Sequence, residues 1–431
     1  MNEHGLIIGG GIGGLLAGHV LADRFERVTI LERDHYPPWT RSFVPPTRRG
    51  APQSRCLHLL TAAGAAAFDK LMPGWSNEVV ALGGIPFDMS ADTALRVFEG
   101  WLPRAPSGIV TYACSRSLVE EALRRVLVKK LNVRIEEGQK VLGFLKHPSG
   151  QGVAGVRVAK LQGAGESTLF GDLVIDASGA GSALAHWIDE LGNGDASPVP
   201  RTVIDTRLSY VSRWFHLDQK DAPNWHCLSA ARTKEAPSRA AIMLRAEEDR
   251  WGVALLAVEG TLLPSNDAGF LNFAAGLRDG ELHNVLSRAT PVSPIHHYGR
   301  CSNRMVHYDR LTVWPEGLVA IGDSVCALDP YFGLGMTAAA RGALLLATHL
   351  DQNGGEMAST HAFQKELASL NVAPWQIATL CDADGRPLAS DRTALRQLYE
   401  SAPASPKITH ALLAMQHMLL PMDALTKGEP A

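Results

Sequence analysis

Residues 5–33 read GLIIGGGIGGLLAGHVLADRFERVTILER. The apolar run at 6–8 is typical of a short buried parallel strand. Three glycines in the spacing G-x-G-x-x-G follow it: Gly9, Gly11 and Gly14. A helical pattern comes next, then a second expected strand over 28–31, and Glu32 follows that strand directly. Strand, glycines, helix, strand and carboxylate in this order predict a β–α–β unit that binds a dinucleotide.

Each glycine of this motif has a separate physical role. Gly9 permits the tight turn out of the first strand, Gly11 lets backbone N–H groups approach a pyrophosphate, and Gly14 lets the helix pack closely on the sheet. The N-terminus of the helix faces the diphosphate, and Glu32 can accept hydrogen bonds from ribose hydroxyls. The motif therefore predicts an adenine dinucleotide, either FAD or NAD(P). The residues expected to contact it are Gly9, Gly11, Gly13, Gly14, Glu32 and Arg33.

Composition narrows the class of protein. The chain has 431 residues, of which 46% are hydrophobic and 20% charged, and its formal net charge is -3. This charge offers no attraction to nucleic acid or to an anionic membrane surface, and no apolar run reaches the length of a membrane-spanning helix. Six cysteines without a C-x-x-C pair fit free thiols in a reducing compartment. We therefore expect a cytoplasmic protein that binds neither nucleic acid nor a membrane.

Three local patterns give further expectations. Ser117 and Glu120 fit an S-x-x-E capping box at the start of a helix. Apolar alternation over 203–215 predicts a strand, whereas 268–286 has a helical pattern. The tail, 358–425, is also predicted to be helical.

A second glycine motif lies near the other end of the chain. Residues 317–347 read GLVAIGDSVCALDPYFGLGMTAAARGALLLA, which predicts a strand, a loop and a long helix. Asp323 at the strand end can hold ribityl hydroxyls, and the P-x-x-G-x-G turn offers N–H groups and a positive helix dipole to an electron-rich heterocycle. The same dipole would stabilise the negative charge of a reduced flavin ring. The expected contacts are Asp323, Pro330, Gly333, Leu334, Gly335 and Met336.

Together the two motifs resemble the FAD-dependent monooxygenases of the aromatic-hydroxylase superfamily (group A), in which GxGxxG lies near the start and GD…PxxGxG late. Other stretches look like a bacterial subgroup that includes flavin-dependent epoxidases of polyketide and terpenoid alkenes, among them squalene-epoxidase-like enzymes: residues 48–64, 114–124, 172–192, 303–318 and 373–384. The resemblance implies FAD as cofactor and NADPH or NADH as reductant.

The resemblance also implies an α/β fold. It consists of a Rossmann-like FAD-binding domain, an inserted substrate domain with a mainly antiparallel β-sheet, and a helical C-terminal tail. On this basis we expect the FAD-binding domain over 1–200, the inserted domain over 201–307, a return to the first domain over 308–350 and the helical region over 351–431.

The resemblance places further residues at the cofactor: Arg49, Gln53, Arg116 and Val141. Arg116 is expected at the FAD diphosphate or ribityl chain, and the alternative is a surface arginine at a helix start. For Val141 the alternative is an ordinary strand residue. The chain also departs from the family pattern: the Asp-Gly pair of the middle motif is Ser178-Gly179 here, and the arginine after it is Gly181. Both departures weaken the expectation that this motif handles pyridine nucleotide.

His58 is a weak candidate for a catalytic base, because imidazole titrates near neutral pH. The alternative is a structural histidine at a helix start. The neighbours His296 and His297 would point to opposite sides of a strand and make a poor metal site. Other His, Cys, Asp and Glu residues lack the spacing of metal ligands, so we expect no metal.

The function that the resemblance implies is NAD(P)H- and O2-dependent oxygenation of an apolar small molecule. One oxygen atom would pass from a flavin C4a-hydroperoxide to the substrate, and epoxidation of an alkene is favoured over hydroxylation because no side-chain base stands out. Two alternatives stay open. A flavin-dependent halogenase shares the scaffold, although the comparable segment DRWGVALLAVEG lacks the W-x-W-x-I-P sequence. A cyclase that uses FAD without redox turnover would carry the same two motifs.

Overall fold

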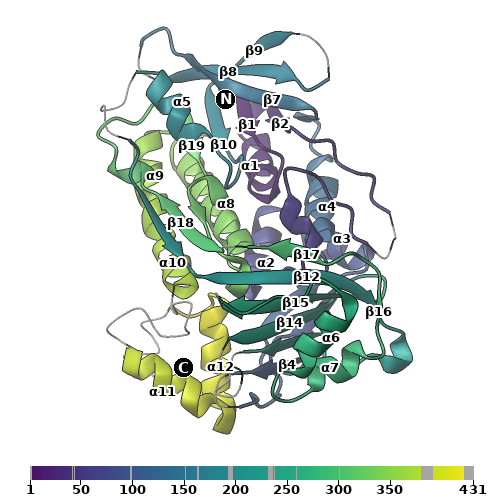
Figure 1. The fold of residues 1–431 in the computed structure, drawn as a ribbon. Coiled ribbons are helices and arrows are strands. Elements are labelled where there is room, and N and C mark those ends of the chain that lie inside the picture. The colour runs from purple at the N-terminus through teal and green to yellow at the C-terminus, as the bar shows by residue number, and fades with distance from the viewer. Residues whose placement is uncertain are drawn as a thin grey trace.

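The computed structural model describes residues 2–40, 42, 44–97, 100–150, 152–162, 165–192, 198–231, 236, 238–258, 260–299, 301–379 and 392–421, with side chains in the last range described from 397 onward. Figure 1 shows a parallel sheet with its helices in the upper half of the view and a mainly antiparallel sheet in the lower half.

The upper sheet has five parallel strands in the order β19-β10-β1-β2-β6. They are β1 (Asn2–Ile8), β2 (Phe25–Leu31), β6 (Val133–Glu136), β10 (Leu173–Asp176) and β19 (Leu318–Ala320). Ile7 lies opposite Ile30 on one side and Ile175 on the other, and none of the three is exposed. Because these strands are parallel, their carboxyl ends meet at one edge, which is where ligands bind in such sheets.

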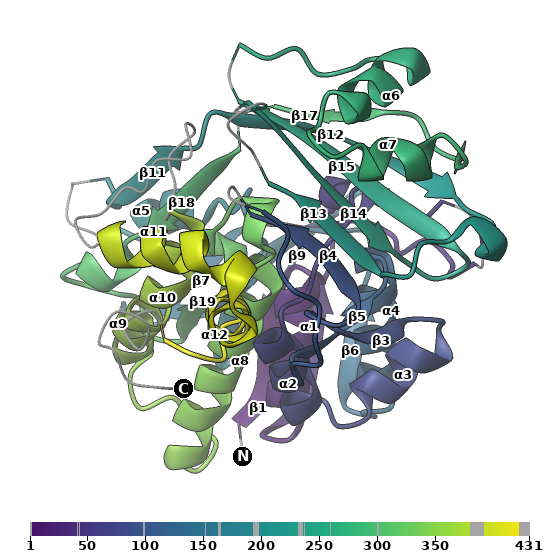
Figure 2. The same cartoon turned by 90° about the horizontal axis from the view of Figure 1, so that it is seen from below.

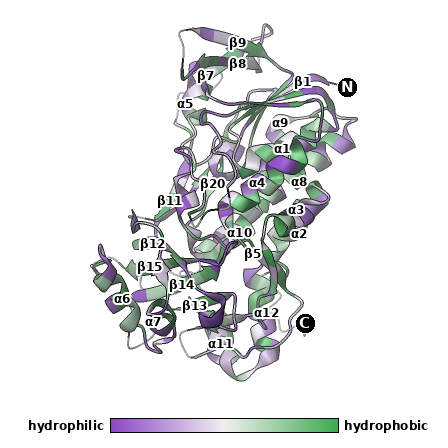
Figure 3. Cartoon of the chain, turned by 90° about the vertical axis from the view of Figure 1, so that its right-hand side faces the viewer, coloured by the Kyte–Doolittle hydropathy of each residue, from purple (hydrophilic) through white to green (hydrophobic). Residues whose placement is uncertain are grey.

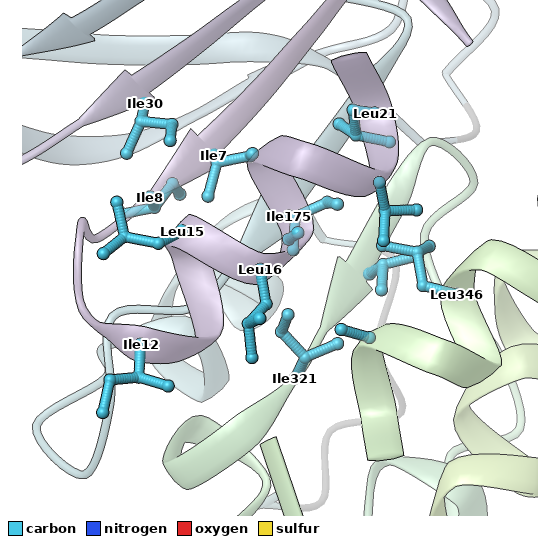
Figure 4. Close-up of a cluster of buried hydrophobic side chains, with 14 of the residues drawn as sticks. Ile7, Ile8, Ile12, Leu15, Leu16, Leu21, Ile30, Ile175, Ile321 and Leu346 are labelled. Atoms are coloured by element: carbon cyan, nitrogen blue, oxygen red, sulfur yellow. The ribbon is translucent and has the colours of Figure 1, made fainter. Parts of the chain in front are cut away.

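Helix α1 (Ile12–Ala22) is buried along nearly its whole length. Figure 4 shows the cluster around it: Leu15, Leu16 and Leu21 of α1, Ile7 and Ile175 of the sheet, and Leu346 of α8 (Gly335–Gln352). Burying each leucine contributes roughly 1.5–3 kcal/mol. A helix that is mostly apolar, as the colouring of α1 in Figure 3 shows, is stable only where other elements cover it. The sheet and α8 together provide that cover.

Other elements complete the upper part of the molecule. The helices are α2 (Ala62–Leu71), α3 (Trp75–Ala81), α4 (Arg116–Leu127) and α5 (Leu184–Glu190). The strands β3 (Ile85–Asp88) and β5 (Val110–Ala113) form an antiparallel pair. The strands β7 (Gln139–Lys146), β8 (Val153–Lys160) and β9 (Glu166–Phe170) form a separate antiparallel sheet.

The lower sheet runs in the order β16-β12-β15-β14-β13-β4, with β17 also paired to β12. Its strands are β4 (Thr93–Arg96), β12 (Leu208–His216), β13 (Cys227–Ala230), β14 (Arg239–Arg245), β15 (Arg250–Val258), β16 (Thr290–Pro291) and β17 (His296–Tyr298). Its pairs are antiparallel except β13 with β4. Helices α6 (Asp267–Ala275) and α7 (Glu281–Leu286) lie over this sheet (Figure 2) and bury Phe270 and Leu282 in its core.

The single strand expected over 203–215 is wrong. The chain forms β11 (Arg201–Asp205), which pairs with β18 (Ser302–Val306), and then enters the lower sheet as β12. Arg207 turns the chain between them with a φ of 52°. The helical pattern over 268–286 likewise becomes two helices, because Gly280 adopts a left-handed conformation between α6 and α7.

The predicted capping box at Ser117 is also wrong. Helix α4 is capped by Ser115, whose Oγ accepts a hydrogen bond from the Leu118 amide at 3.2 Å. The Ser115 hydroxyl in turn donates to Glu247 Oε1 at 2.5 Å, from the turn between β14 and β15. The cap is therefore fixed by a tertiary contact that the local spacing does not reveal, while the Ser117 hydroxyl donates to the Pro46 carbonyl.

The tail is helical in its described parts: α9 (Thr360–Leu370), α10 (Val372–Ala378), α11 (Arg392–Ser401) and α12 (Pro406–Gln416). With the parallel sheet, the mainly antiparallel sheet and these helices in place, the predicted fold class is confirmed. Within the described residues, no helix combines the length and apolar character needed to cross a membrane.

Asp329 orders the loop that leads into α8. Its side chain caps the short 3-10 helix η5 (Pro330–Phe332) by accepting a hydrogen bond from the Tyr331 amide at 3.1 Å. Asn303 of β18, which is fully buried, accepts from the Asp329 amide at 2.8 Å and donates to its carboxylate at 3.4 Å. Burial raises the pKa of Asp329 to about 6, although these hydrogen bonds oppose the rise.

Replacing Gly14 by alanine should destabilise the protein. A Cβ at Gly14 would lie 1.8 Å from the Gly9 carbonyl oxygen, so α1 would have to move away from β1. We expect a loss of roughly 1–3 kcal/mol in the free energy of unfolding, measured by denaturant titration. The control is Gly13→Ala in the same helix, where the added Cβ lies 3.9 Å from Ala339 and should be tolerated. Equal losses in the two variants would contradict the predicted packing.

The Asp329→Asn variant should gain stability relative to the native protein as pH rises. The folded-state pKa of about 6 lies above the ordinary 3.8, so the native fold favours the protonated carboxyl. That stabilisation is complete below about pH 4 and is lost as pH rises to about 6. Asparagine does not titrate, and the relative gain should reach about 3 kcal/mol, measured by denaturant titration at pH 4 and pH 7.5. A difference in stability between the two proteins that does not change with pH would show that the pKa of Asp329 is not raised in the native fold.

Asp88→Asn is the matched control. Burial alone would raise the pKa of Asp88, but the amides of Ala91 and Ser90 and the Ser107 hydroxyl lower it to about 2. The charged carboxylate is therefore the form that stabilises the fold at and above pH 4. This variant should lose stability at both pH values, by nearly the same amount.

Candidate functional site

A cavity of about 1170 Å³ lies at the carboxyl edge of the parallel sheet. One wall comes from the ends of β1 and β2, the facing wall from β4, β13 and β14 of the lower sheet, and a third from the start of α8 and the end of α12. The volume exceeds the roughly 300–1,000 Å³ of ordinary ligand pockets. The cavity therefore has room for a large cofactor and a second small molecule.

The first glycine motif forms one end of this cavity. Gly9 has a φ of 97°, and a Cβ there would lie 2.6 Å from the Ala177 carbonyl oxygen. Gly11 is the N-cap of α1 and faces open space, since the nearest atom to a Cβ would be Arg48 Nη2 at 3.9 Å. The unpaired N–H groups of the first turn of α1 lie at the same cavity. Gly14 does not line the cavity but packs beneath the turn, against Gly9.

The second glycine motif, at the start of α8, lies next to the first, at the start of α1. A Cβ on Gly13 of α1 would lie 3.9 Å from the Cβ of Ala339 in α8, and one on Gly335 would lie 3.7 Å from Asp323 Oδ1. The N-termini of α1 and α8 therefore open onto one cavity, although the two segments are remote in the chain. Burial raises the pKa of Asp323, and the guanidinium groups of Arg116 and Arg304 oppose that rise.

Hydrogen bonds and an ion pair within the protein fix the position of the Glu32 carboxylate. It is 4% exposed; its Oε2 accepts from the Gly10 amide at 2.7 Å, and its Oε1 accepts from the Asp34 amide at 2.8 Å and lies 3.0 Å from Arg48 Nη1. Arg48 also pairs with Glu120 at 2.9 Å. The carboxylate lines the cavity, so ribose hydroxyls would share it with these donors.

The structure brings most of the expected cofactor residues to the cavity wall: Gly9, Gly11, Gly13, Glu32, Arg33, Gln53, Arg116, Val141, Asp323, Pro330, Gly333, Leu334, Gly335 and Met336. Arg49 does not line it and is exposed, whereas its neighbour Arg48 does. Arg116 is buried beside Glu120 at 2.7 Å. The doublet of arginines was visible in the sequence, but only the fold shows which of the two turns inward.

Two histidines line the cavity. His58 was expected from the sequence; its Nδ1 lies 3.2 Å from the Cys56 carbonyl oxygen. His417, at the end of α12, was missed because its segment has no motif; its Nδ1 accepts a hydrogen bond from the Ala62 amide at 3.0 Å. Burial lowers the pKa of each to about 4, and Arg116 adds to the effect at His58.

The part of the wall that the lower sheet and its neighbouring segments form is mainly apolar, although Arg96, Tyr210 and Ser229 also line it. It includes Met89, Leu95, Val97, Leu102 and Ile242. Trp251, in the segment compared with the halogenase motif, is 1% exposed in the core of the lower sheet and does not line the cavity. Among the described residues, no three His, Cys, Asp or Glu side chains gather as they would around a metal ion, and His296 and His297 belong to β17.

Comparison with known proteins adds sequence and fold relationships. No family model matches the chain. Protein Rv3254 of Mycobacterium tuberculosis is 30% identical over 350 residues, which cover 78% of this chain and 70% of that protein.

Solved structures with similar folds are flavin-dependent enzymes. The flavin-dependent brominase Bmp2 superposes with a TM-score of 0.68 at 15% identity, covering 96% of this chain and 94% of that one. The p-nitrophenol 4-monooxygenase PnpA from Pseudomonas putida DLL-E4 superposes with a TM-score of 0.67 at 17% identity, covering 97% and 98%. The chain thus belongs to the family of Rv3254 and has the fold of the FAD-dependent monooxygenases of the aromatic-hydroxylase type and of the related halogenases.

Proposed function

We propose that this protein is an FAD-dependent monooxygenase that uses NADPH or NADH and O2 to transfer one oxygen atom to an apolar small molecule. The observation that carries the proposal is the meeting of the two glycine motifs at one cavity, with the N-termini of α1 and α8 beside each other. The positive ends of both helices suit a diphosphate and an electron-rich ring. The fold likeness to flavin enzymes agrees with this but shows the fold alone.

The residues present fit FAD. Gly11 leaves open space in front of the first turn of α1, which is what the close approach of a diphosphate needs. Asp323 lies in the short 3-10 helix Gly322–Ser324 that follows β19, close to the α8 N-terminus, where ribityl hydroxyls would be held. The bound flavin would supply the redox chemistry and the activation of oxygen.

The protein's own residues determine the shape of the site and exclude water from it. Leu95, Val97 and Ile242 present an apolar surface to the substrate end and exclude water from it. Arg116, held against Glu120, keeps positive charge near Asp323 at the cofactor end. Epoxidation needs no enzymatic base, and burial lowers the pKa of both cavity histidines to about 4, so we favour an alkene substrate over a phenol.

Purified protein should carry FAD and show its visible absorbance, and NADPH or NADH should bleach that absorbance without oxygen. In air, incubation with candidate apolar alkenes and labelled oxygen should give products heavier by one oxygen atom, detected by mass spectrometry. Protein that refuses FAD would refute the proposal. Bound FAD that no nicotinamide bleaches would favour the non-redox cyclase, and halide incorporation would favour the halogenase.

Replacing Gly11 by valine should weaken flavin binding without unfolding the protein. Gly11 has a φ of -75°, which any residue adopts, and the added methyl groups would enter the cavity. We expect the Kd for FAD to rise roughly 10- to 100-fold, from a steric cost of about 1–3 kcal/mol, measured by flavin titration of the stripped protein. Gly299→Val is the control, because a Cβ at Gly299 meets no atom within 4 Å and the residue lies outside the cavity wall. Equal weakening in both variants would count against diphosphate binding at Gly11.

A further inference from the structure

The first glycine motif contains a glycine that its spacing does not require. In G-x-G-x-x-G the second position is free, yet the chain has Gly10 there, between Gly9 and Gly11. The φ of Gly10 is not positive, so its backbone conformation does not demand glycine. A Cβ at Gly10 would, however, lie 2.1 Å from the hydroxyl oxygen of Tyr36. The glycine is therefore explained by its close contact with a tyrosine that follows the second strand of the sheet.

Side chains bind both polar groups of the Gly10 backbone. The Tyr36 hydroxyl donates a hydrogen bond to the Gly10 carbonyl oxygen at 2.5 Å, and Arg48 Nη2 donates to the same oxygen at 3.4 Å. The Gly10 amide donates to Glu32 Oε2 at 2.7 Å. Gly10 is buried and does not line the cavity, whereas Gly9 and Gly11 do. The shortest of these three hydrogen bonds is the one from Tyr36.

The carbonyl of Gly10 and the N–H of Gly11 belong to one peptide unit. In a trans peptide these two groups point in opposite directions, and the described residues contain no cis peptide bond. The hydrogen bond from Tyr36 therefore turns the Gly11 N–H away from Tyr36. Gly11 lines the cavity and Tyr36 does not, and no acceptor for the Gly11 N–H lies among the described residues. This N–H is thus left available to a ligand at the N-terminus of α1.

Several contacts fix Tyr36 itself. The residue precedes Pro37, which disfavours a helical backbone at Tyr36. Its amide donates to Glu137 Oε2 at 3.1 Å. The guanidinium carbons of Arg48 and Arg124 lie 5.1 and 4.3 Å from the centre of its ring, where the aromatic face attracts a cation. Burial raises the pKa of the Tyr36 hydroxyl, which therefore stays protonated and remains a hydrogen-bond donor.

We propose that Tyr36 is a positioning residue of the diphosphate site, because its hydroxyl fixes the peptide between Gly10 and Gly11 with the Gly11 N–H available to the diphosphate of FAD. The inference rests on the proposed function in taking the N-terminus of α1 as the diphosphate site. It extends that site to a residue outside the glycine motif. Tyr36 acts through Gly10, since it does not itself line the cavity.

Titration of the flavin-stripped protein with FAD tests the role of the hydroxyl. Tyr36→Phe removes the hydroxyl and keeps the ring, so the Kd for FAD should rise roughly 2- to 10-fold, as expected for the loss of one hydrogen bond. Tyr112→Phe is the matched control and should leave the Kd unchanged, because Tyr112 packs on Trp75 outside the cavity wall. The phosphorus NMR signals of bound FAD should shift in Tyr36→Phe and not in Tyr112→Phe. A general loss of stability would not produce that difference.

A double-mutant cycle tests the close contact between Tyr36 and Gly10. In the native background, Gly10→Ala should raise the Kd for FAD roughly 5- to 100-fold, because the new Cβ displaces the Tyr36 hydroxyl. In the Tyr36→Phe background that oxygen is absent, and only the contacts with Glu32 at 3.1 and 3.2 Å remain. The same change should then raise the Kd by a factor about 3-fold smaller or less. Its effect on the denaturation midpoint of the flavin-free protein should also be smaller in this background.

The outcomes separate this inference from the proposed function. Native protein that refuses FAD would refute the proposed function. Native protein that binds FAD and keeps its affinity on Tyr36→Phe would overturn only the role of Tyr36, and so would unchanged phosphorus signals. Equal effects of Gly10→Ala in the two backgrounds would also overturn it. The denaturation measurements need no cofactor, so they test the contact between Tyr36 and Gly10 even in protein that binds none.

Discussion

The close approach of α1 and α8 is the constraint on which the site depends. Both helices are apolar where they meet, and the residues at their N-terminal ends are small: Gly13 on one side, Ala339 on the other, with Gly322 beside them. A larger side chain at Gly14 would clash with the Gly9 carbonyl oxygen and push α1 away from the first strand, which would shift the N-terminus of α1 relative to that of α8. The packing of α1 and α8 on the parallel sheet therefore determines where the positive N-terminal ends of the two helices lie at the cavity.

A buried network of alternating charges fixes the neighbouring loop and helix. Arg48 lies between Glu32 and Glu120, and Glu120 also pairs with Arg116; each of the four side chains is under a tenth exposed. Two cations and two anions balance, which limits the cost of taking them out of water. The network joins the end of β2, the loop after it and the start of α4, three segments that the cavity needs in fixed positions. Removing one member would leave a buried charge without its partner, which costs more than the loss of an exposed ion pair.

The lower sheet is attached to the same helix. Glu247, in the turn between β14 and β15, accepts from both the amide and the hydroxyl of Ser115 at the start of α4, and pairs with the fully buried Arg250. The two sheets are thereby coupled at the helix that carries Arg116. Side chains that do not line the cavity thus fix the position of its two facing walls relative to each other.

Local sequence predicted the parts of the fold that local physics determines. The turn at Gly9, the packing of Gly14 and the start of α8 follow from glycine spacing and apolar patterning, and most of the residues expected at the cofactor do lie on the cavity wall. Tertiary contacts determined the rest. Ser115 caps α4 because Glu247 reaches it from another sheet, and β4 joins the lower sheet from a distant part of the chain. Neither the contact of Glu247 with Ser115 nor the pairing of β4 with β13 can be predicted from the residues next to them in the sequence.

The same reasoning explains why the apolar part of the cavity could not be predicted from the sequence. Where a cofactor supplies the chemistry, the protein has to provide only a cavity of the right shape, the exclusion of water and a few fixed polar groups. Such groups need no sequence motif. Leu95, Ile242 and His417 come from a strand, a second strand and a terminal helix, each ordinary in its own segment. His58 looked like a possible base in isolation, but the Cys56 carbonyl and the burial of its ring make it a neutral acceptor. What a histidine can do here is decided by the atom its Nδ1 faces, and that atom is known only once the chain is folded.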